Sequence, residues 1–322
     1  MSTSVKLPNG RDFPLVGLGT WQSTPEQVQA AVEAAIDAGY RHIDTAAAYV
    51  NEEPIGKAIK NKIAAGVVKR EDLFITTKLH IQNLHRAEVM PSAKKSAQNL
   101  GLDYLDLYLV HAPIGLQKGD ALFPVGADGK PLIDETIDHL DTWKGMEEVY
   151  QAGLAKAIGL SNFNSKQIKN IYDNATVKPM NLQVECHAHF RQLKLHEFCK
   201  SLGITFTAYA PLGSPNRSGS TLPGTQKGVV EGGPMADPVI VSIASKHGKT
   251  PAQVCLRYLM QREIAVIPKS VTPARIQQNF DVFNFALSPE EMETINKLPT
   301  NNRTFNSEYF KGSKHYPFHE EF

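Results

Sequence analysis

The chain has 322 residues, and its 34 basic and 33 acidic side chains leave a formal net charge of +1 at pH 7. This balance excludes a bulk electrostatic attraction to nucleic acid or to an anionic membrane surface. The three cysteines lie far apart, at positions 186, 199 and 255, which argues against a secreted disulfide framework and against a structural zinc site.

Neither a targeting segment nor a membrane span is predicted. Residues 1–6 lack the apolar core of a signal peptide, and no uncharged apolar run approaches about 18 residues. Hydrophobic residues make up 42% of the chain, which is enough for one large buried core. We therefore expect a soluble globular protein of a reducing compartment, the cytoplasm.

The first elements follow one another closely. Asn9-Gly10 predicts a β-hairpin, and Leu15–Gly19 predicts a strand. Thr24-Pro25-Glu26-Gln27 is typical of a helix start, with Thr24 and Gln27 as a capping box and Pro25 in the first turn. Gly39 is expected to end this helix.

The same strand-then-helix unit recurs along the chain. Further strands are predicted at His42–Asp44, Leu73–Lys78, Leu105–Val110, Ala155–Leu160, Met180–Val184, Ile204–Tyr209 and Ile264–Ile267. Their helices are predicted from about Glu52, at Ala87–Leu100 and His139–Ala152, and from near Asn164, Leu193, Pro251 and Pro273. Strict alternation with short connections favours a closed (β/α)8 TIM barrel, although an open doubly wound sheet remains the rival because alternation does not show closure.

The last segment adds one extra helix and a tail. Ser288-Pro289-Glu290-Glu291 predicts a capped helix after the eighth unit, and Leu298–Phe322 is expected to be an extended, non-helical tail. No change of composition marks a linker, so residues 1–322 are interpreted as a single domain.

Polar side chains interrupt the predicted strands near their carboxyl ends. Asp44, Lys78 and His111 end three consecutive strands, and Tyr49 follows Asp44 by five residues. Active sites of such barrels lie at this end of the strands, and neighbouring strands are about 4.8 Å apart, so these side chains should converge. Each alone has an ordinary interpretation, as a helix cap, a solvated lysine or a structural histidine, but all four at one edge favour a catalytic cluster.

This cluster predicts proton donation to a carbonyl. A neighbouring ammonium lowers the pKa of a tyrosine, which is ordinarily about 10, and a carboxylate keeps that ammonium charged and oriented. Asp44, Lys78 and Tyr49 would thus form a general acid, and His111 would orient or polarise a carbonyl oxygen. Without a nucleophile or a metal cluster, such chemistry needs a hydride source.

The chain also resembles a known family, the aldo-keto reductases, particularly their aldose reductase-like branch, over essentially its whole length. The motifs that carry this resemblance are Gly17-Leu18-Gly19-Thr20-Trp21, Arg41–Ala46 with Tyr49, Thr76-Thr77-Lys78-Leu79, Leu109-Val110-His111, Gly159–Phe163, Gln183–His187, Ile267–Pro273 and Tyr316–Phe322. The resemblance implies a (β/α)8 barrel that binds NADPH in an extended form and reduces aldehydes and ketones.

It also implies roles for individual residues. Tyr49 would donate the proton, Lys78 and Asp44 would tune it, and His111 would orient the substrate carbonyl. Ser161, Asn162 and Gln183 would hold the nicotinamide carboxamide, with Tyr209 stacked on the ring. Further implied cofactor contacts are Thr20, Trp21 and Asp44. The pyrophosphate would lie along the segment from Ala210 through Gly233, which includes Leu212 and Ser214. The 2′-phosphate would contact Lys269, Ser270, Val271, Thr272 and Arg275, and the adenine would contact Gln278 and Asn279.

The residues at the phosphate end support an anion site independently. Lys269 and Arg275 flank a Ser-Val-Thr-Pro helix start, where free backbone N–H groups and the helix dipole favour an anion. The alternative is an ordinary capped helix with two surface cations.

The substrate end departs from the family pattern. Trp21 and Phe123 are retained, but His80 and Ala112 stand where tryptophan is usual, and the third usual tryptophan is missing among Asn216–Ser220. The expected substrate contacts are Trp21, His80, His111, Ala112 and Phe123. Because two of them are smaller or more polar than tryptophan, we expect a wider and more polar pocket. The alternative is that the divergent tail closes the pocket through Phe305, Tyr309 and Phe310. Gln278 also replaces an acidic residue.

The sequence is compatible with three classes of protein. The leading interpretation is an NADPH-dependent reductase of small carbonyl substrates that acts as a monomer without a metal. The first alternative is an NADPH-binding regulatory or structural barrel with little turnover. The second is a metal-dependent barrel hydrolase, which would need metal ligands at the strand ends. The positive charge of Lys78 there would repel a metal ion, and the pair His187-x-His189 lacks a third ligand.

Overall fold

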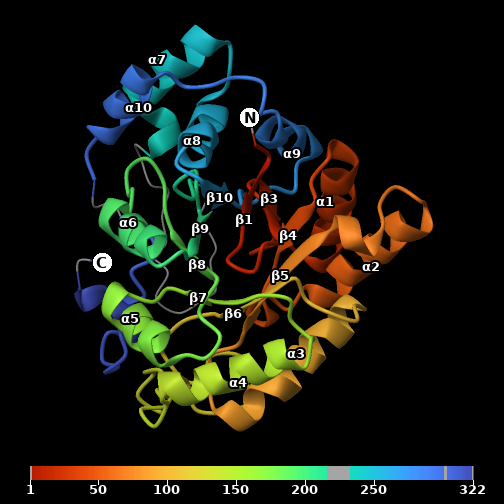
Figure 1. Cartoon of the computed structure of the whole chain (residues 1–322), viewed down its shortest axis with the longest axis vertical. Helices are drawn as coiled ribbons and strands as arrows, with labels where there is room; N and C mark the ends of the chain where they lie inside the picture. The colour runs from red at the N-terminus through yellow and green to blue at the C-terminus, as the bar shows by residue number, and fades with distance from the viewer. Residues whose placement is uncertain (1, 216–232, 301–302, 321) are drawn as a thin grey trace.

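The computed structural model describes residues 2–215, 233–300, 303–320 and 322. Eight parallel strands form the wall of a barrel around which the helices are arranged (Figure 1). The strands are β3 (Gly17–Gly19), β4 (His42–Asp44), β5 (Phe74–Leu79), β6 (Leu107–Val110), β7 (Ile158–Ser161), β8 (Asn181–Glu185), β9 (Thr205–Tyr209) and β10 (Ile264–Val266).

Each strand pairs with the next one in sequence, and the ends of this order meet. Parallel bridges join Val16 to Val266 and Gly19 to Lys269, so the first strand lies beside the eighth. The predicted (β/α)8 barrel is therefore confirmed, and the open doubly wound sheet is wrong.

The helices of the repeating units lie where the sequence predicts them, within a few residues. They are α1 (Pro25–Ala38), α2 (Glu52–Ala64), α3 (Arg86–Leu100), α4 (His139–Gln151), α5 (Ser165–Asn174), α6 (Leu193–Ser201), α8 (Pro251–Met260) and α9 (Pro273–Phe280). Thr24 and Gln27 form the predicted capping box, and Gly39 ends α1 in the left-handed conformation at φ 107°. Apolar side chains of both layers form one continuous core.

Two helices lie outside the repeat. The predicted α10 (Pro289–Asn296) begins with a capping box between Ser288 and Glu291. The helix α7 (Pro238–His247) was not predicted, although Asp237 caps it and its buried residues follow helical spacing at Ile240, Ile243 and Ala244. The glycine-rich composition just before it obscured this signal.

Short 3-10 turns complete the secondary structure. They are η1 (Ala47–Tyr49), η2 (Arg70–Asp72), η3 (Pro234–Ala236), η4 (Glu308–Phe310) and η5 (Pro317–His319). The last two lie in the tail, so the expectation of an entirely non-helical tail is wrong. Tail residues Phe310 and Tyr316 are buried in a small second cluster with Ile81, Ile114 and Leu116.

The predicted hairpin covers one end of the barrel. Strands β1 (Ser4–Lys6) and β2 (Asp12–Pro14) are antiparallel, and the buried Phe13 ring packs 4.9 Å from Phe74, the first residue of β5. The amino-terminal ends of the strands are thus closed, and the carboxyl ends remain available for a site.

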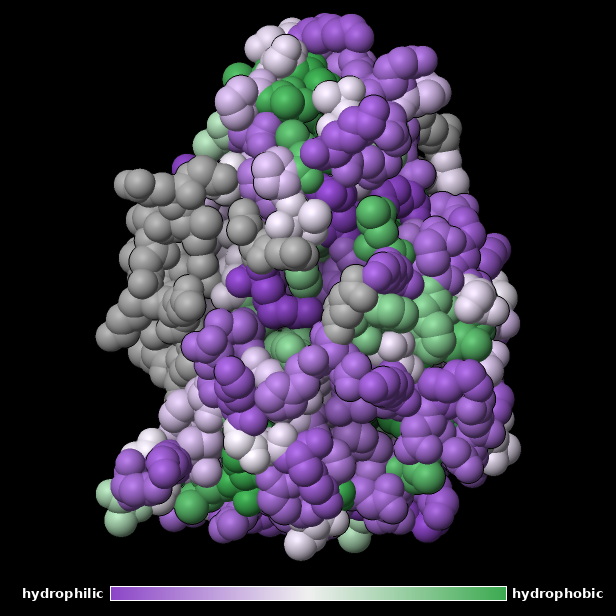
Figure 2. Space-filling view, turned by 90° about the vertical axis from the view of Figure 1, so that its left-hand side faces the viewer, coloured by the Kyte–Doolittle hydropathy of each residue, from purple (hydrophilic) through white to green (hydrophobic). Residues whose placement is uncertain are grey.

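The face of the molecule shown in Figure 2 is largely polar. Hydrophilic side chains dominate the face shown in Figure 2, with hydrophobic residues in separate areas between them. Among the described residues, none of the helices combines the length and apolar character that a membrane crossing requires.

Candidate active site

The four predicted catalytic residues meet at the carboxyl ends of β4, β5 and β6. The Lys78 ammonium donates to Asp44 Oδ1 at 2.6 Å, to the Thr45 carbonyl at 2.8 Å and to the Tyr49 hydroxyl at 3.4 Å. The turn η1 brings Tyr49 back over the strand ends, and its ring lies edge-on to His111 with centroids 5.7 Å apart. The convergence predicted from the sequence is therefore observed.

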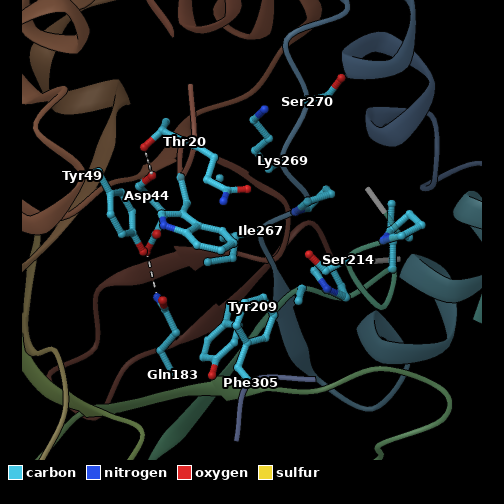
Figure 3. A pocket seen from close by; sticks show the side chains of 18 of the residues that line it. Thr20, Asp44, Tyr49, Gln183, Tyr209, Ser214, Ile267, Lys269, Ser270 and Phe305 are labelled. Atoms are coloured by element: carbon cyan, nitrogen blue, oxygen red, sulfur yellow. Dashed lines mark hydrogen bonds between the residues drawn. The ribbon is translucent and has the colours of Figure 1, made fainter. Parts of the chain in front are cut away.

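Neighbouring side chains fix Asp44. Gln183 on β8 donates from Nε2 to Asp44 Oδ2 at 2.7 Å, across the barrel interior, and Thr20 donates to the Asp44 carbonyl at 2.9 Å. Figure 3 shows both contacts and the closeness of Tyr49 to Asp44. With both carboxylate oxygens engaged, Asp44 holds the Lys78 ammonium in one orientation.

Burial governs the protonation of this cluster. It raises the pKa of Asp44 and lowers the pKa of Lys78, and the contact between the two opposes both shifts. Burial also raises the pKa of Tyr49 well above its ordinary value, and the charge of Asp44 adds to this shift. The expectation that Lys78 lowers the pKa of Tyr49 is therefore wrong for the resting protein, because burial and Asp44 outweigh it.

His111 is neutral in this environment. Burial and then the charge of Lys78 hold the pKa of its imidazole well below the ordinary 6.5. The His111 carbonyl accepts a hydrogen bond from Asn162 Nδ2 at 2.9 Å, and Tyr209 donates to Asn162 Oδ1 at 2.8 Å. Asn162 has a left-handed backbone, with φ 64°, which is uncommon for a residue other than glycine.

These groups lie at one end of a cavity of about 790 Å³. Every predicted catalytic, cofactor and substrate residue lines it except Lys78, which is 1% exposed and lies behind Asp44. The lining residues among those predicted are Thr20, Trp21, Asp44, Tyr49, His80, His111, Ala112, Phe123, Ser161, Asn162, Gln183, Tyr209, Leu212, Ser214, Lys269, Ser270, Val271, Thr272, Arg275, Gln278 and Asn279.

The far end of the cavity is cationic. Lys269 and Arg275 line it beside the first turn of α9, whose N-cap residue Thr272 makes no side-chain cap. Lys269 and Ser270 lie well apart from Tyr49 in Figure 3. The start of α8, at residues 250–252, also lines this cavity, which the sequence analysis did not assign. The N-termini of α8 and α9 and the two cationic side chains would together favour binding of an anion at this end.

Comparisons with known proteins assign the chain to a family. The family model for the aldo/keto reductase family matches residues 15–299. The chain belongs to the aldo/keto reductase family. It is 49% identical over 298 residues to aldo-keto reductase family 1 member A1 of Gallus gallus, covering 92% of this chain and 89% of that protein. The human protein of the same name is 46% identical over 301 residues, covering 93% of this chain and 90% of that protein.

A solved structure is also similar throughout. The aldose reductase from Schistosoma japonicum superposes with a TM-score of 0.91 at 45% identity, with 99% of each chain covered. As a member of the aldo/keto reductase family with an aldose reductase-like fold, the chain is an enzyme, an oxidoreductase.

Two residues that stand where tryptophan was expected lie at the substrate end of the cavity. Ala112 and His80 line the cavity, and the His80 ring lies 5.8 Å from that of Phe123. Burial lowers the pKa of His80 to about 4, so its imidazole is neutral. Residues 216–232, which include the place of the third expected tryptophan and most of the expected pyrophosphate segment, lie outside the described residues.

The tail supplies part of the missing wall. Phe305 and Phe310 line the cavity, while Tyr309 packs against Phe310 with centroids 5.2 Å apart and donates to the Gly129 carbonyl. Ile81 and Met235 also line it and were not predicted, since an apolar residue gives no local sign that it faces a pocket. The pocket is therefore aromatic as well as polar.

The remaining histidine motif has structural partners. His187 lies 3.1 Å from Glu185 and His189 lies 2.8 Å from Asp237, so each imidazole contacts its own carboxylate. Within residues 2–215, 233–300, 303–320 and 322, no group of three His, Cys, Asp or Glu side chains is placed to hold a metal ion.

Proposed function

We propose that this enzyme reduces aldehydes and ketones to alcohols with NADPH, and that Tyr49 donates the proton. The observation that carries this proposal is the Lys78 ammonium, which lies between Asp44 at 2.6 Å and the Tyr49 hydroxyl at 3.4 Å at the end of a deep cavity. Family membership supports carbonyl reduction, and the cluster supports the assignment of the donor.

The residues of the cavity fit an extended dinucleotide phosphate. Gln183 uses Nε2 on Asp44 and keeps Oε1 for a carboxamide N–H, with Ser161 and Asn162 beside it. Tyr209, whose hydroxyl is fixed on Asn162, offers its ring for stacking. Lys269 and Arg275 would pair with the 2′-phosphate that distinguishes NADPH from NADH.

When bound, NADPH would supply the hydride, and the chain would manage the proton. Tyr49 keeps its proton at neutral pH because its pKa is raised, so the acid is fully present. As the proton leaves, the nearby Lys78 ammonium stabilises the tyrosinate oxygen, and Asp44 holds that ammonium in place. Lys78 thus acts during the transfer and not by lowering the resting pKa.

His111 would orient the substrate. Its neutral imidazole can donate one hydrogen bond to a carbonyl oxygen without placing a second cation beside Lys78. Residues from Gly19 to Phe310 of one chain line the cavity, so no residue of a second copy is needed for the site, and we also propose that the chain acts as one domain and as a monomer. All three cysteines are buried and unpaired, which supports a cytoplasmic site of action.

Tyr49→Phe tests the proposal. This variant removes the proton and keeps the ring, so kcat for carbonyl reduction should fall by at least about 100-fold while NADPH binding stays nearly unchanged. Cofactor oxidation is followed by absorbance and cofactor binding by fluorescence. Tyr150→Phe, on the outer helix α4, is the matched control. Turnover within a few-fold of wild type in Tyr49→Phe would remove Tyr49 from its role.

A further inference from the structure

Glu185, the last residue of β8, binds the carboxyl-terminal tail. Its side chain is fully buried, and Oε1 and Oε2 accept hydrogen bonds from the backbone N–H groups of Thr304 at 2.6 Å and Phe305 at 2.8 Å. His187 Nε2 lies 3.1 Å from the same Oε1. One carboxylate that holds two consecutive N–H groups fixes both the position and the direction of the tail.

This contact places the Phe305 ring inside the cavity. The ring lies edge-on between two aromatic side chains, 5.5 Å from Trp21 and 5.6 Å from Tyr209. Figure 3 shows Phe305 beside Tyr209, at the end of the pocket that holds Gln183. Phe305 therefore joins the substrate wall to the side chain proposed to stack on the nicotinamide.

The strand β8 serves two parts of the site. Gln183 and Glu185 are two residues apart, so their side chains lie on the same face of the strand. Gln183 holds Asp44 at 2.7 Å, and Glu185 holds the tail. The position of the tail is thereby tied to the position of the catalytic cluster through one short piece of backbone.

We propose that Glu185 is a positioning residue that sets substrate selectivity by docking Phe305 over the reacting end of the pocket. The selectivity part of this inference rests on the proposed carbonyl reduction. Glu185 acts through Phe305 and contacts neither the proton donor nor the reacting carbonyl. Because both hydrogen bonds come from backbone N–H groups, they fix the path of the tail independently of its side chains.

The test compares two buried carboxylates that each accept hydrogen bonds from two consecutive backbone N–H groups. Glu147 on α4 accepts from the backbone N–H groups of Thr176 at 2.6 Å and Val177 at 2.8 Å, in the loop that leads into β8 at the end opposite the pocket. Glu185→Gln replaces one of two acceptor oxygens by an NH₂ group that faces a donor, whereas Glu147→Gln keeps the shared acceptor Oε1 and removes the negative charge that strengthens both hydrogen bonds. Both should lower the melting temperature, but only the first should affect the pocket.

The second anchor of the tail keeps Glu185→Gln testable. The Arg303 guanidinium lies 4.5 Å from the centroid of the Phe190 ring in the barrel, so the tail keeps a second contact with the barrel when one hydrogen bond is lost. Phe305→Ala and the double variant Glu185→Gln/Phe305→Ala complete a double-mutant cycle. This cycle measures how far the effect of the Glu185 carboxylate depends on the Phe305 ring.

Steady-state kinetics with NADPH give the first readout. For benzaldehyde, Glu185→Gln and Phe305→Ala should each raise KM about three- to tenfold, as expected for losing one aromatic contact, with kcat within about twofold. The double variant should be no worse than Phe305→Ala, and Glu147→Gln should keep the wild-type KM. An unchanged KM in Glu185→Gln, or effects that multiply in the double variant, would overturn the inference.

Acrylamide quenching of tryptophan gives a readout independent of activity. Trp143 is 2% exposed, so the quencher reports mainly on Trp21, which touches Phe305. Quenching should increase in Glu185→Gln and Phe305→Ala and stay unchanged in Glu147→Gln; equal quenching in all variants would refute docking of Phe305 by Glu185. If wild type reduces no carbonyl compound, the proposed function fails, and the quenching result still decides the tail contact.

Discussion

The Lys78 ammonium and the Asp44 carboxylate form a buried ion pair 2.6 Å apart, and neither side chain is more than 2% exposed. A buried pair of this kind contributes little net stability, because desolvation of both charges offsets their attraction. Its position next to the Tyr49 hydroxyl, 3.4 Å from the ammonium, indicates a role in chemistry instead.

Removing the ammonium should abolish turnover. Lys78→Met should lower kcat by about 100-fold or more, comparably to Tyr49→Phe, because the tyrosinate formed on proton transfer loses its neighbouring cation. It should also destabilise the fold by about 3–5 kcal/mol, since Asp44 stays buried without its partner. Adding Asp44→Asn should restore stability but not activity, as measured by urea unfolding and by NADPH oxidation. Recovery of turnover in the double variant would contradict the role of Lys78.

The cofactor preference should depend on Arg275. Charge-assisted contacts to a phosphate contribute about 1.5–3 kcal/mol each, so two of them predict at least a tenfold preference for NADPH over NADH. Arg275→Ala should lose about tenfold of that preference while NADH affinity changes little. The exposed Arg86, which pairs with Glu148 on the outer helices, gives the control variant Arg86→Ala. Equal wild-type affinities for the two cofactors, measured by fluorescence titration, would exclude the phosphate contact.

Rebuilding a wall at Ala112 should shift selectivity. Ala112→Trp returns an indole to the substrate end, next to the second apolar cluster that includes Ile81 and Phe310. Because a buried aromatic side chain covers about 150–250 Å², the ratio of kcat/KM for a small apolar aldehyde over a bulky ketone should increase. Ala112→Leu is the smaller companion variant. No change of the ratio would mean that Phe305 and Phe310 already close this side.

Because His111 is neutral, the kcat/KM for carbonyl reduction should not change as the pH falls below neutrality. Its pKa is held well below 6.5 by burial and by the charge of Lys78, so the imidazole remains unprotonated as the pH falls through the ordinary histidine value of 6.5. The kcat/KM for carbonyl reduction should therefore stay constant through the ordinary histidine range. An inflection near pH 6.5 that disappears in His111→Gln would show that this imidazole titrates there.

Buried histidines should make the fold sensitive to acid. The pKa of His80 is lowered by burial from 6.5 to about 4, so the unfolded state binds more protons than the folded state over this interval. The contribution of His80 to stability is present above pH 6.5 and is lost as the pH falls towards 4. The free energy of unfolding should fall by up to about 1.4 kcal/mol per pH unit for this group.

His80→Phe provides the comparison. It keeps an aromatic ring beside Phe123 and removes the titration, so urea unfolding between pH 7 and 4.5 should show a shallower loss of stability. The other histidines whose pKa values are lowered by burial, which are His42, His111, His139 and His196, still titrate in the variant, so part of the pH dependence of stability remains. Identical slopes in the variant and in wild type would contradict the assigned shift.

The order and type of most elements could be predicted from the sequence because their signals are local. A capping box, a proline in the first turn or a glycine in the left-handed conformation acts within a few residues, as at Thr24 and Gly39. The convergence of Asp44, Lys78 and His111 was also predictable, since each stands at or next to the carboxyl end of a strand and parallel strands bring these ends to one edge.

Only the tertiary structure decided the closure of the barrel, the protonation of Tyr49 and the composition of the substrate wall. Closure depends on contacts between Val16 and Val266, 250 residues apart, which leave no periodic signal in either segment. The pKa of Tyr49 depends on how deeply it is buried, and burial is set by the whole fold. Phe305 reaches the pocket because Glu185, 120 residues earlier, accepts its backbone N–H. Every residue except proline carries such an N–H group, so the sequence does not show which one a buried carboxylate will bind.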